Sequence, residues 1–258
     1  MNQIINREDF KKDKYLFNLV SHNLDYNDYQ VITDNKNYAF VIGKPNKEIW
    51  IWTSSLEDNV INELINKLNE IISKKDYCFV SKKDLYERLK EKINYIEDNP
   101  FIYDNYVCEK IIEPLKVDGF LAKATLDDKD VIAHFWKDNC DNFGYDITYE
   151  LCLKFAESWI NSNTFYVWKN NNQIVSFVGY EIVDNTAEIS HAYTSPKERG
   201  KGYMPYLIYS VTKIIMSKGL LPILNTDYSY DSSNNAYKKV GFKETELIYS
   251  FSTIKHKD

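Results

Sequence analysis

The sequence contains only four cysteines, and their spacing argues against two common uses of this residue. Cys78, Cys108, Cys140 and Cys152 include no Cys-x-x-Cys pair, so they indicate neither a disulfide framework nor a metal site. We expect them to be reduced thiols in a cytoplasmic protein that holds no metal.

Long hydrophobic runs are missing as well. No apolar stretch approaches the roughly 20 residues that a helix needs to span a bilayer. Residues 1–14 are polar and lack the apolar centre of a secretion signal. The sequence therefore predicts no association with a membrane.

Positive charge is less abundant than negative charge. The 32 lysines and arginines stand against 38 aspartates and glutamates, which gives a formal net charge of −6. Broad nucleic-acid binding requires a basic face, so we expect no nucleic-acid partner. The lysine-rich tetrapeptides at 73–76 and 81–84 are interpreted as solvated surface.

The hydrophobic pattern divides the chain into two parts. The chain has 258 residues, which is somewhat longer than chains that usually fold around a single hydrophobic core. The predicted boundary lies between Glu113 and Gly119, so we expect domains at 1–118 and 119–258. The first part is predicted to hold strands at 38–43, 48–53 and 77–81, helices at 58–72 and 84–93, and a loosely patterned helix at 7–24.

The second part predicts an α/β fold with a mixed sheet. A hairpin at 164–183 is expected to turn at Asn170 to Asn172. Leu151, Phe155 and Trp159 are expected on one side of a helix together with Ile160. The predicted helices cover 125–136, 148–160, 203–217 and 233–240, and the remaining strands cover 187–194, 221–227 and 242–252.

The turn Arg199-Gly200-Lys201-Gly202 lies between a predicted strand and a predicted helix. A helix start leaves backbone N–H groups unsatisfied and carries partial positive charge, and glycine lets a ligand approach those donors. The turn therefore predicts an anion site, although a capped turn without a ligand is the alternative. The pattern is neither a Walker A motif nor Gly-x-Gly-x-x-Gly, so neither a nucleoside triphosphate nor a dinucleotide is expected.

Two motifs together resemble the GCN5-related N-acetyltransferase family. The pyrophosphate loop of that family reads Arg/Gln-x-x-Gly-x-Gly/Ala, and Arg199, Gly202 and Met204 occupy those places here, with Met204 as a departure. The later family motif Tyr-x-x-x-Gly-Phe is matched from Tyr237 to Phe242. The chain is most similar to the two-domain bacterial type, although Tyr230-Asp231 stands where those proteins usually show Asn-Pro.

The resemblance implies a fold and a cosubstrate. It implies a mixed, mostly antiparallel sheet flanked by helices, preceded by a smaller degenerate copy of the same fold in residues 1–118. It also implies acetyl-CoA, with its pyrophosphate on the turn and its pantetheine arm along the preceding strand. The implied coenzyme-binding residues are Ala192, Tyr193, Thr194, Arg199, Gly200, Lys201, Gly202, Tyr203, Met204 and Asn234.

Two catalytic residues follow from the same resemblance. Glu188 lies eleven residues before Arg199, at the spacing of a general base in the family, and Tyr237 stands at the place of the general acid. Strand alternation predicts that Glu188, Ser190, Ala192 and Thr194 share one face, with His191 packed on the other. An exposed strand-edge carboxylate and a core aromatic are the alternatives for Glu188 and Tyr237.

The implied activity is transfer of an acetyl group to a primary amine of a small molecule or peptide. The alternatives are a coenzyme-binding sensor with little turnover, a protein-interaction module, and a first domain that recruits a macromolecular acceptor. The acceptor itself is not readable, although residues 136–150 are candidates to line its pocket. The aromatic rings and carboxylates of Phe135, Trp136, Asp141, Phe143, Tyr145 and Asp146 favour a cationic amine, or they simply pack a helix pair.

Overall fold

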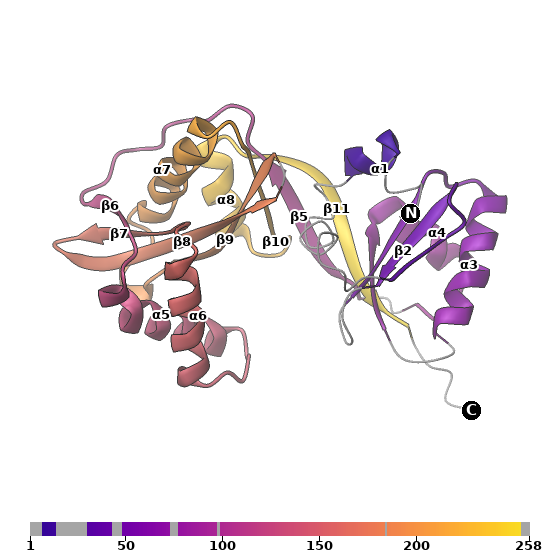
Figure 1. The fold of residues 1–258 in the computed structure, drawn as a ribbon, viewed down its shortest axis with the longest axis horizontal. Coiled ribbons are helices and arrows are strands. Elements are labelled where there is room, and N and C mark those ends of the chain that lie inside the picture. The colour runs from indigo at the N-terminus through magenta and orange to yellow at the C-terminus, as the bar shows by residue number, and fades with distance from the viewer. Residues whose placement is uncertain are drawn as a thin grey trace. The chain divides into compact units, whose positions relative to one another are not determined.

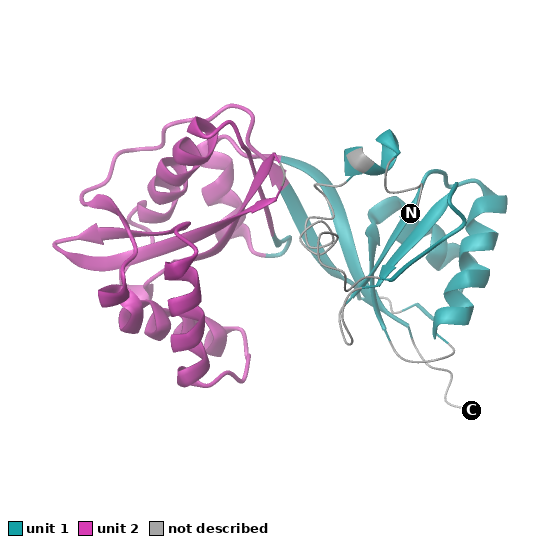
Figure 2. Cartoon of the chain, viewed as in Figure 1, with its two compact units in different colours: residues 1–105, 226–229, 244–258 teal, residues 106–225, 230–243 magenta. Residues whose placement is uncertain are grey.

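The computed structural model describes residues 7–13, 30–42, 48–72, 77–96, 99–183 and 185–253. Most of the predicted helix at 7–24 and the lysine-rich piece at 73–76 lie outside these residues. The chain divides into two compact units (Figure 2). Unit 1 comprises residues 1–105, 226–229 and 244–258, and unit 2 comprises residues 106–225 and 230–243.

Unit 1 is built on mixed strand pairing. Its sheet has the strand order β1, β2, β3, β4, β11 and β5, with β3 and β4 parallel and the pairs β1–β2, β2–β3 and β4–β11 antiparallel. The strands predicted at 38–43 and 48–53 are confirmed as the antiparallel pair β2 and β3. The strands are β1 (Gln30–Thr33), β2 (Tyr38–Ile42), β3 (Ile49–Thr53), β4 (Cys78–Lys82), β5 (Phe101–Val107) and β11 (Lys243–Ser252).

Helices α3 (Asp58–Ile72) and α4 (Lys83–Lys92) supply the core of unit 1, and α1 (Glu8–Asp13) is a short helix of the same unit. Apolar residues in α3 recur every three or four positions, so they form one stripe along the helix. That stripe is buried against the strands, as the sequence predicts. Its buried members are Val60, Ile61, Leu64, Leu68 and Ile71.

Unit 2 is a meander with one parallel strand added. The strands β6 (Phe120–Lys123), β7 (Phe165–Asn170), β8 (Gln173–Val183) and β9 (Thr186–Thr194) pair antiparallel in sequence order. Strand β10 (Leu221–Asp227) then pairs parallel with β9. The predicted α/β class with a mostly antiparallel sheet is confirmed.

Two pairs of helices cover the two faces of this sheet (Figure 1). Helices α5 (Lys129–Asn142) and α6 (Tyr149–Asn161) pack on one face, and α7 (Tyr203–Ser217) and α8 (Asp231–Val240) pack on the other. Two short 3-10 turns, Leu126–Asp128 and Pro196–Glu198, precede α5 and α7. Within the described residues, none of the helices has both the length and the apolarity to cross a bilayer.

The predicted apolar side of α6 is only partly buried. Cys152, Ala156 and Ile160 are buried, whereas Leu151 and Phe155 are 40% and 38% exposed. The helix carries two adjacent apolar stripes, and the sheet accepts the one with the smaller side chains. Leu151 and Phe155 are therefore left at the surface, whereas Trp159 of the same stripe packs against the core.

The division of the chain differs from the predicted boundary at 118/119. Residues 106–119 contact unit 2, because the Cys108 N–H donates to the Pro222 carbonyl at 2.9 Å and the Trp168 indole donates to the Asp118 carbonyl at 2.9 Å. Residues 244–258 belong to unit 1, where residues 248–252 of β11 pair with β4. Sequence-local patterns do not reveal such long-range strand pairing, so a single cut point could not describe it.

Candidate functional site

The turn between β9 and α7 has the backbone that its glycines predict. Gly200 and Gly202 have φ angles of +78° and +85°, in the left-handed region that other residues rarely adopt. A side chain built on Gly200 would meet no atom within 4 Å, whereas one on Gly202 would lie 3.1 Å from Cγ1 of Val117. The outer side of the turn is therefore open to a ligand, and the inner side is backed by Val117.

The amides of this turn are available to an acceptor. In the described part of the chain, the N–H groups from Gly200 to Met204 donate to no backbone carbonyl. The first N–H bond of α7 runs from Tyr206 to Gly202, since Pro205 has no N–H to offer. Adjacent free donors at the start of a 15-residue helix with no acid in its first turn are suited to bind an anion.

Two cations flank the turn. Arg199 donates from Nε to the Thr194 carbonyl at 3.1 Å, and its guanidinium lies 5.6 Å from the ring centroid of Tyr193. Lys201 pairs with Glu198 at 2.9 Å. Both side chains are exposed enough to turn toward an anion.

Two predicted coenzyme residues face inward instead. The Tyr203 ring is buried, and its hydroxyl accepts a hydrogen bond from Asn170 at 2.6 Å. Met204 packs against the same core. Only the backbone of these two residues is therefore available to a ligand.

Strands β9 and β10 separate beside the turn. They pair only from Thr186–Leu221 to Glu188–Ile223, although β9 continues to Thr194. Beyond Glu188, the edge of β9 that faces β10 carries backbone groups that β10 does not use. An extended ligand with amide groups can add to such an edge as a short strand.

A β-bulge at His191 changes the predicted alternation. Gly179 faces Ser190 and Phe177 faces Tyr193, so Val178 alone stands opposite His191 and Ala192. His191 has a φ of +55°, which accommodates the extra residue.

The predicted common face is therefore wrong beyond Ser190. Ala187 and Ile189 pack toward α7, which places Glu188 and Ser190 on the other side of β9. Ala192 also packs toward α7, whereas Tyr193 joins the core under α5 and α6. The extra residue at the bulge is the physical reason, since it shifts the alternation by one position.

The carboxylate of Glu188 is oriented by a residue that the sequence reading missed. Its Oε1 accepts a hydrogen bond of 3.1 Å from Nδ2 of Asn225 on β10. Ile223 pairs with Glu188, and Asn225 lies two positions further along the same face. This alternation was readable from the strand sequence, but the parallel pairing that brings Asn225 to Glu188 was not.

His191 lies on the same side of β9 as Glu188, not on the opposite side as predicted. Its ring stacks on Trp159 at 4.3 Å and meets Trp136 edge-on at 5.4 Å. Burial lowers the pKa of His191 to about 4, against a smaller raising effect of Glu188. The imidazole is therefore neutral at pH 7, and its interpretation as a packed histidine is confirmed.

Tyr237 lies on α8 with its ring in the core. It is 8% exposed and packs against Tyr106 and Phe242, each with ring centroids 6.2 Å apart. Burial raises the pKa of Tyr237 to about 12. Asn234, one turn earlier, is 5% exposed.

The glycine that follows α8 has a clear structural reason. Gly241 has a φ of +102°, and a side chain there would lie 2.4 Å from the carbonyl oxygen of Lys110. The Ile112 N–H also donates to the Val240 carbonyl at 2.7 Å. Residues 110–112 therefore pass too close to the end of α8 for any residue except glycine.

The predicted acceptor-side residues separate into two groups. Phe135 packs against Phe177 and Tyr193 in the core, and Trp136 contacts Trp159 and His191. Asp141 forms an ion pair with Lys137. By contrast, Phe143, Tyr145 and Asp146 are exposed in the connection between α5 and α6.

Comparisons with known proteins agree with these observations. Residues 131–242 match the family model described as "Acetyltransferase (GNAT) family", and this range includes Glu188, the turn and Tyr237. No curated protein matches the chain.

Three solved structures share the fold across most of the chain. A GNAT acetyltransferase from Colwellia psychrerythraea is 13% identical, with a TM-score of 0.63 over 93% of this chain and 89% of its own. A GCN5-related N-acetyltransferase from Sphaerobacter thermophilus is 11% identical, with a TM-score of 0.61 over 86% and 81%. One from Kribbella flavida is 10% identical, with a TM-score of 0.60 over 92% and 94%.

Proposed function

We propose that this protein transfers an acetyl group from acetyl-CoA to a primary amine, and the match of residues 131–242 to the acetyltransferase (GNAT) family model supports this proposal. The observation that carries the proposal is the row of free amides from Gly200 to Met204, which lies beside the separation of β9 from β10. A phosphate site and a strand edge for an extended arm suit the two halves of coenzyme A.

The turn would hold the pyrophosphate. The amides from Gly200 to Met204 supply the donors, and the cations of Arg199 and Lys201 add charge at the rim. The backbone of Ala192, Tyr193 and Thr194 would pair with the pantetheine arm. Asn234 on α8 would contact the same arm from the other side of the opening.

Glu188 is the proposed general base. A free alkylamine has a pKa near 10.4, so about one molecule in a few thousand is nucleophilic at pH 7, a deficit of ~5 kcal/mol. A positioned base typically recovers about 10²- to 10⁴-fold in rate. The bond from Asn225 holds the Glu188 carboxylate in one orientation, so that it can accept the ammonium proton directly or through water.

Tyr237 is the proposed hydrogen-bond donor to the departing sulfur. With a pKa of about 12, its phenol stays protonated at any physiological pH. Complete proton transfer to a thiolate of pKa about 8.5 would be uphill by ~5 kcal/mol. Tyr237 therefore stabilises the thiolate mainly by donating a hydrogen bond, and the proton that the amine loses balances the one that the thiol gains.

Unit 1 is proposed to be a degenerate copy of the same fold. Solved structures of GNAT proteins align with more than nine tenths of this chain, which supports a two-part layout. Unit 1 lacks a Gly-x-Gly turn before a helix in its described residues, so we assign it no coenzyme site.

The test combines binding with turnover. Acetyl-CoA affinity is measured by calorimetry, and thiol release is followed with a panel of primary amines. Tight binding with amine-dependent thiol release supports the proposal. Tight binding without turnover on any amine or peptide would favour a coenzyme sensor, and absence of binding would remove the site from the turn.

A further inference from the structure

Three exposed aromatic rings meet at one edge of unit 2. Phe143, Tyr145 and Tyr230 are 53%, 66% and 40% exposed, although large aromatic side chains usually bury most of their surface. The ring centroid of Phe143 lies 6.5 Å from that of Tyr145 and 6.0 Å from that of Tyr230. The three rings, here called the aromatic edge, join the α5–α6 connection to the start of α8.

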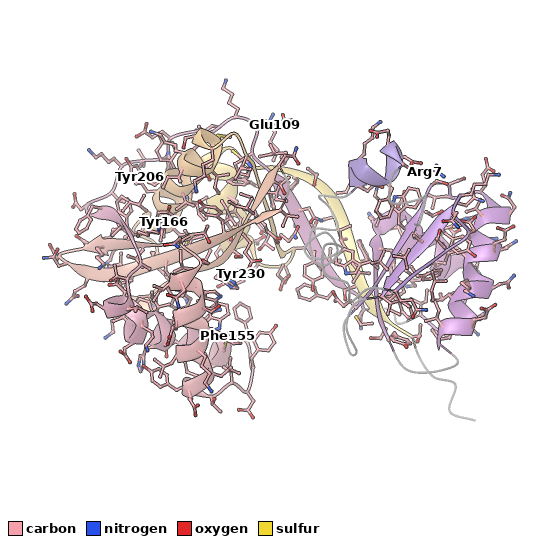
Figure 3. All side chains as sticks on the ribbon, in the orientation of Figure 1. Arg7, Glu109, Phe155, Tyr166, Tyr206 and Tyr230 are labelled. Carbon is pink, nitrogen blue, oxygen red and sulfur yellow. The ribbon has the colours of Figure 1, made fainter. Side chains whose placement is uncertain are left out.

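The aromatic edge lies at the start of α8, the helix that carries Asn234 and Tyr237. Tyr230 immediately precedes α8, and its carbonyl accepts the N–H of Asn234 at 3.3 Å. In Figure 3 Tyr230 lies on the same side of the sheet as Phe155 of α6. Alternation along β9 places Glu188 on that side as well, because Ala187 and Ile189 pack toward α7.

Strand β9 carries a buried hydroxyl on Tyr193. Tyr193 is 3% exposed, and within the described residues its hydroxyl makes no hydrogen bond. Burial, and then the nearby carboxylate of Asp138, raise the pKa of Tyr193, while the guanidinium of Arg199 lowers it. The side chain of Tyr230 also raises the pKa of Tyr193, by a smaller electrostatic effect.

The surroundings of the aromatic edge carry excess negative charge. Asp138, Asp146 and Asp231 are exposed, and none of them forms an ion pair within the described residues. Lys137 is already paired with Asp141. Arg199 is bound to the carbonyl at the end of β9, next to the phosphate turn.

Exposed aromatic rings and nearby carboxylates together favour the binding of a cation. Aromatic faces attract positive charge through their quadrupole, and carboxylates without partners do so by their own charge. An uncharged apolar ligand would gain nothing from the carboxylates, and an anion would be repelled. The reacting amine must lose its charge beside Glu188, so a cation at the aromatic edge is a second positive centre.

We infer that the acceptor is a diamine or polyamine, whose distal ammonium group binds Phe143, Tyr145 and Tyr230 while its reacting nitrogen faces Glu188. This inference rests on the proposed acetyl transfer. It narrows the acceptor from any primary amine to an aliphatic amine with a second positive charge.

The first experiment compares matched acceptors. α,ω-Diamines with three to eight methylene groups are tested against n-alkylamines of the same length. For the best-fitting length, the diamine is expected to have a KM about tenfold lower, since each cation–π contact at an exposed site contributes about two- to fivefold. Equal KM values at every length, or a preference for an acidic or lysine-free peptide, would overturn the inference.

Substitutions at Phe143 test whether the preference for a diamine depends on the aromatic edge. Phe143→Leu is expected to reduce the diamine-to-monoamine ratio to about one third, and Phe143→Trp to preserve it. The matched control is Phe120→Leu, because Phe120 is 48% exposed on β6 of the same unit and should leave the ratio unchanged. A ratio that falls equally in both leucine variants would place the cation elsewhere.

A second measurement separates this inference from the proposed function. An alkane with a trimethylammonium group at each end cannot be acetylated, and its Kd is compared with that of the singly charged analogue in the presence of coenzyme A. Tighter binding of the doubly charged compound, lost in Phe143→Leu, supports the inference even if no amine is acetylated. Equal Kd values together with acetylation of simple amines would overturn the inference and leave the proposed function standing.

Discussion

Helices α3 and α7 are both 15 residues long, yet they begin in opposite ways. In unit 1, α3 begins with Asp58, whose carboxylate pairs with Arg88 and Lys92. In unit 2, α7 begins after Gly202, with no acid in its first turn. The positive end of α3 is balanced by an acid of its own chain, whereas the first turn of α7 contains no acid to balance its positive end.

The strands of the two units also differ, because their pairing is regular in unit 1 and interrupted in unit 2. The hairpin of β2 and β3 keeps one register over its five pairs, and its inner face is a closed core. Strand β9 instead contains a bulge and separates from its neighbour after three pairs. The proposed site therefore lies where the regular strand pairing is interrupted. In unit 1 the strand pairing of β2 and β3 is regular, and these strands contribute only to the core.

The largest effect is expected from a substitution that blocks the open start of α7. Gly202→Val places a β-branched residue at a φ of +85° and against Val117, so we expect loss of measurable acetyl-CoA binding by calorimetry. The matched control is Gly219→Val at the other end of α7. Gly219 has a φ of +74° but no atom within 4 Å of the added carbon.

Strain alone would affect both glycine variants alike. The control is therefore expected to lose some stability and to keep its coenzyme affinity. Retained affinity in Gly202→Val would show that the coenzyme binds somewhere other than this turn.

Glu188→Gln is expected to lower kcat/KM by about 10²- to 10⁴-fold, with the deepest loss at low pH, where free amine is scarcest. Asn225→Ala, which leaves the carboxylate in place without its hydrogen bond, is expected to have a smaller effect of about tenfold. A variant at Glu188 with the parental pH–rate profile would point to another base.

The buried side chain of His191 is expected to make the free energy of unfolding depend on pH. Its pKa is about 4 in the folded protein and about 6.5 when unfolded, so the unfolded chain binds the extra proton between these values. The free energy of unfolding should therefore fall by about 3 kcal/mol as the pH is lowered from 6.5 to 4. His191→Asn, which tolerates the positive φ, should lose this dependence in urea titrations; an unchanged slope would assign it to other groups.

Tyr237→Phe is expected to slow turnover by about tenfold with little change in coenzyme affinity. Because burial raises the pKa of Tyr237 to about 12, the parental rate should show no loss of this donor up to pH 10. Stopped-flow thiol release beside calorimetry measures both quantities. An unchanged rate in the variant would leave Tyr237 as a core aromatic only.

The smallest effect is expected in unit 1. Asp58→Ala removes the acid at the start of α3 and both of its exposed ion pairs, so thermal stability should fall slightly. Acetyl-CoA affinity should be unaltered. A clear loss of affinity would mean that unit 1 takes part in coenzyme binding.

The sequence predicts regular elements well and interruptions poorly. Helices α3 and α7 were predicted at their observed bounds, because apolar residues recur every three or four positions between clear start and stop signals. Strand β5 was not predicted, since Asp104 and Asn105 are buried in its middle and resemble a turn. No residue pattern reveals that His191 adopts a positive φ, because the bulge depends on the register with β8.

For the site, the sequence supplies the glycine turn and the positions of Glu188 and Tyr237, but not their surroundings. Asn225 reaches Glu188 only through parallel strand pairing, and Trp159 reaches His191 only through the packing of α6. These contacts join segments that are far apart in sequence. Their chemistry becomes visible only when the fold brings the segments together.

Residues 106–119 act as a brace for the amide turn. Val117 lies behind Gly202, Asp118 receives the Trp168 indole, and the carbonyl of Lys110 lies against Gly241. A shortened protein that starts at Gly119 would keep every motif and lose this support. Without Val117 behind Gly202, the proposed phosphate site would have to become ordered when the coenzyme binds, so the affinity for the coenzyme would fall. A version that starts at Tyr106 would keep this support.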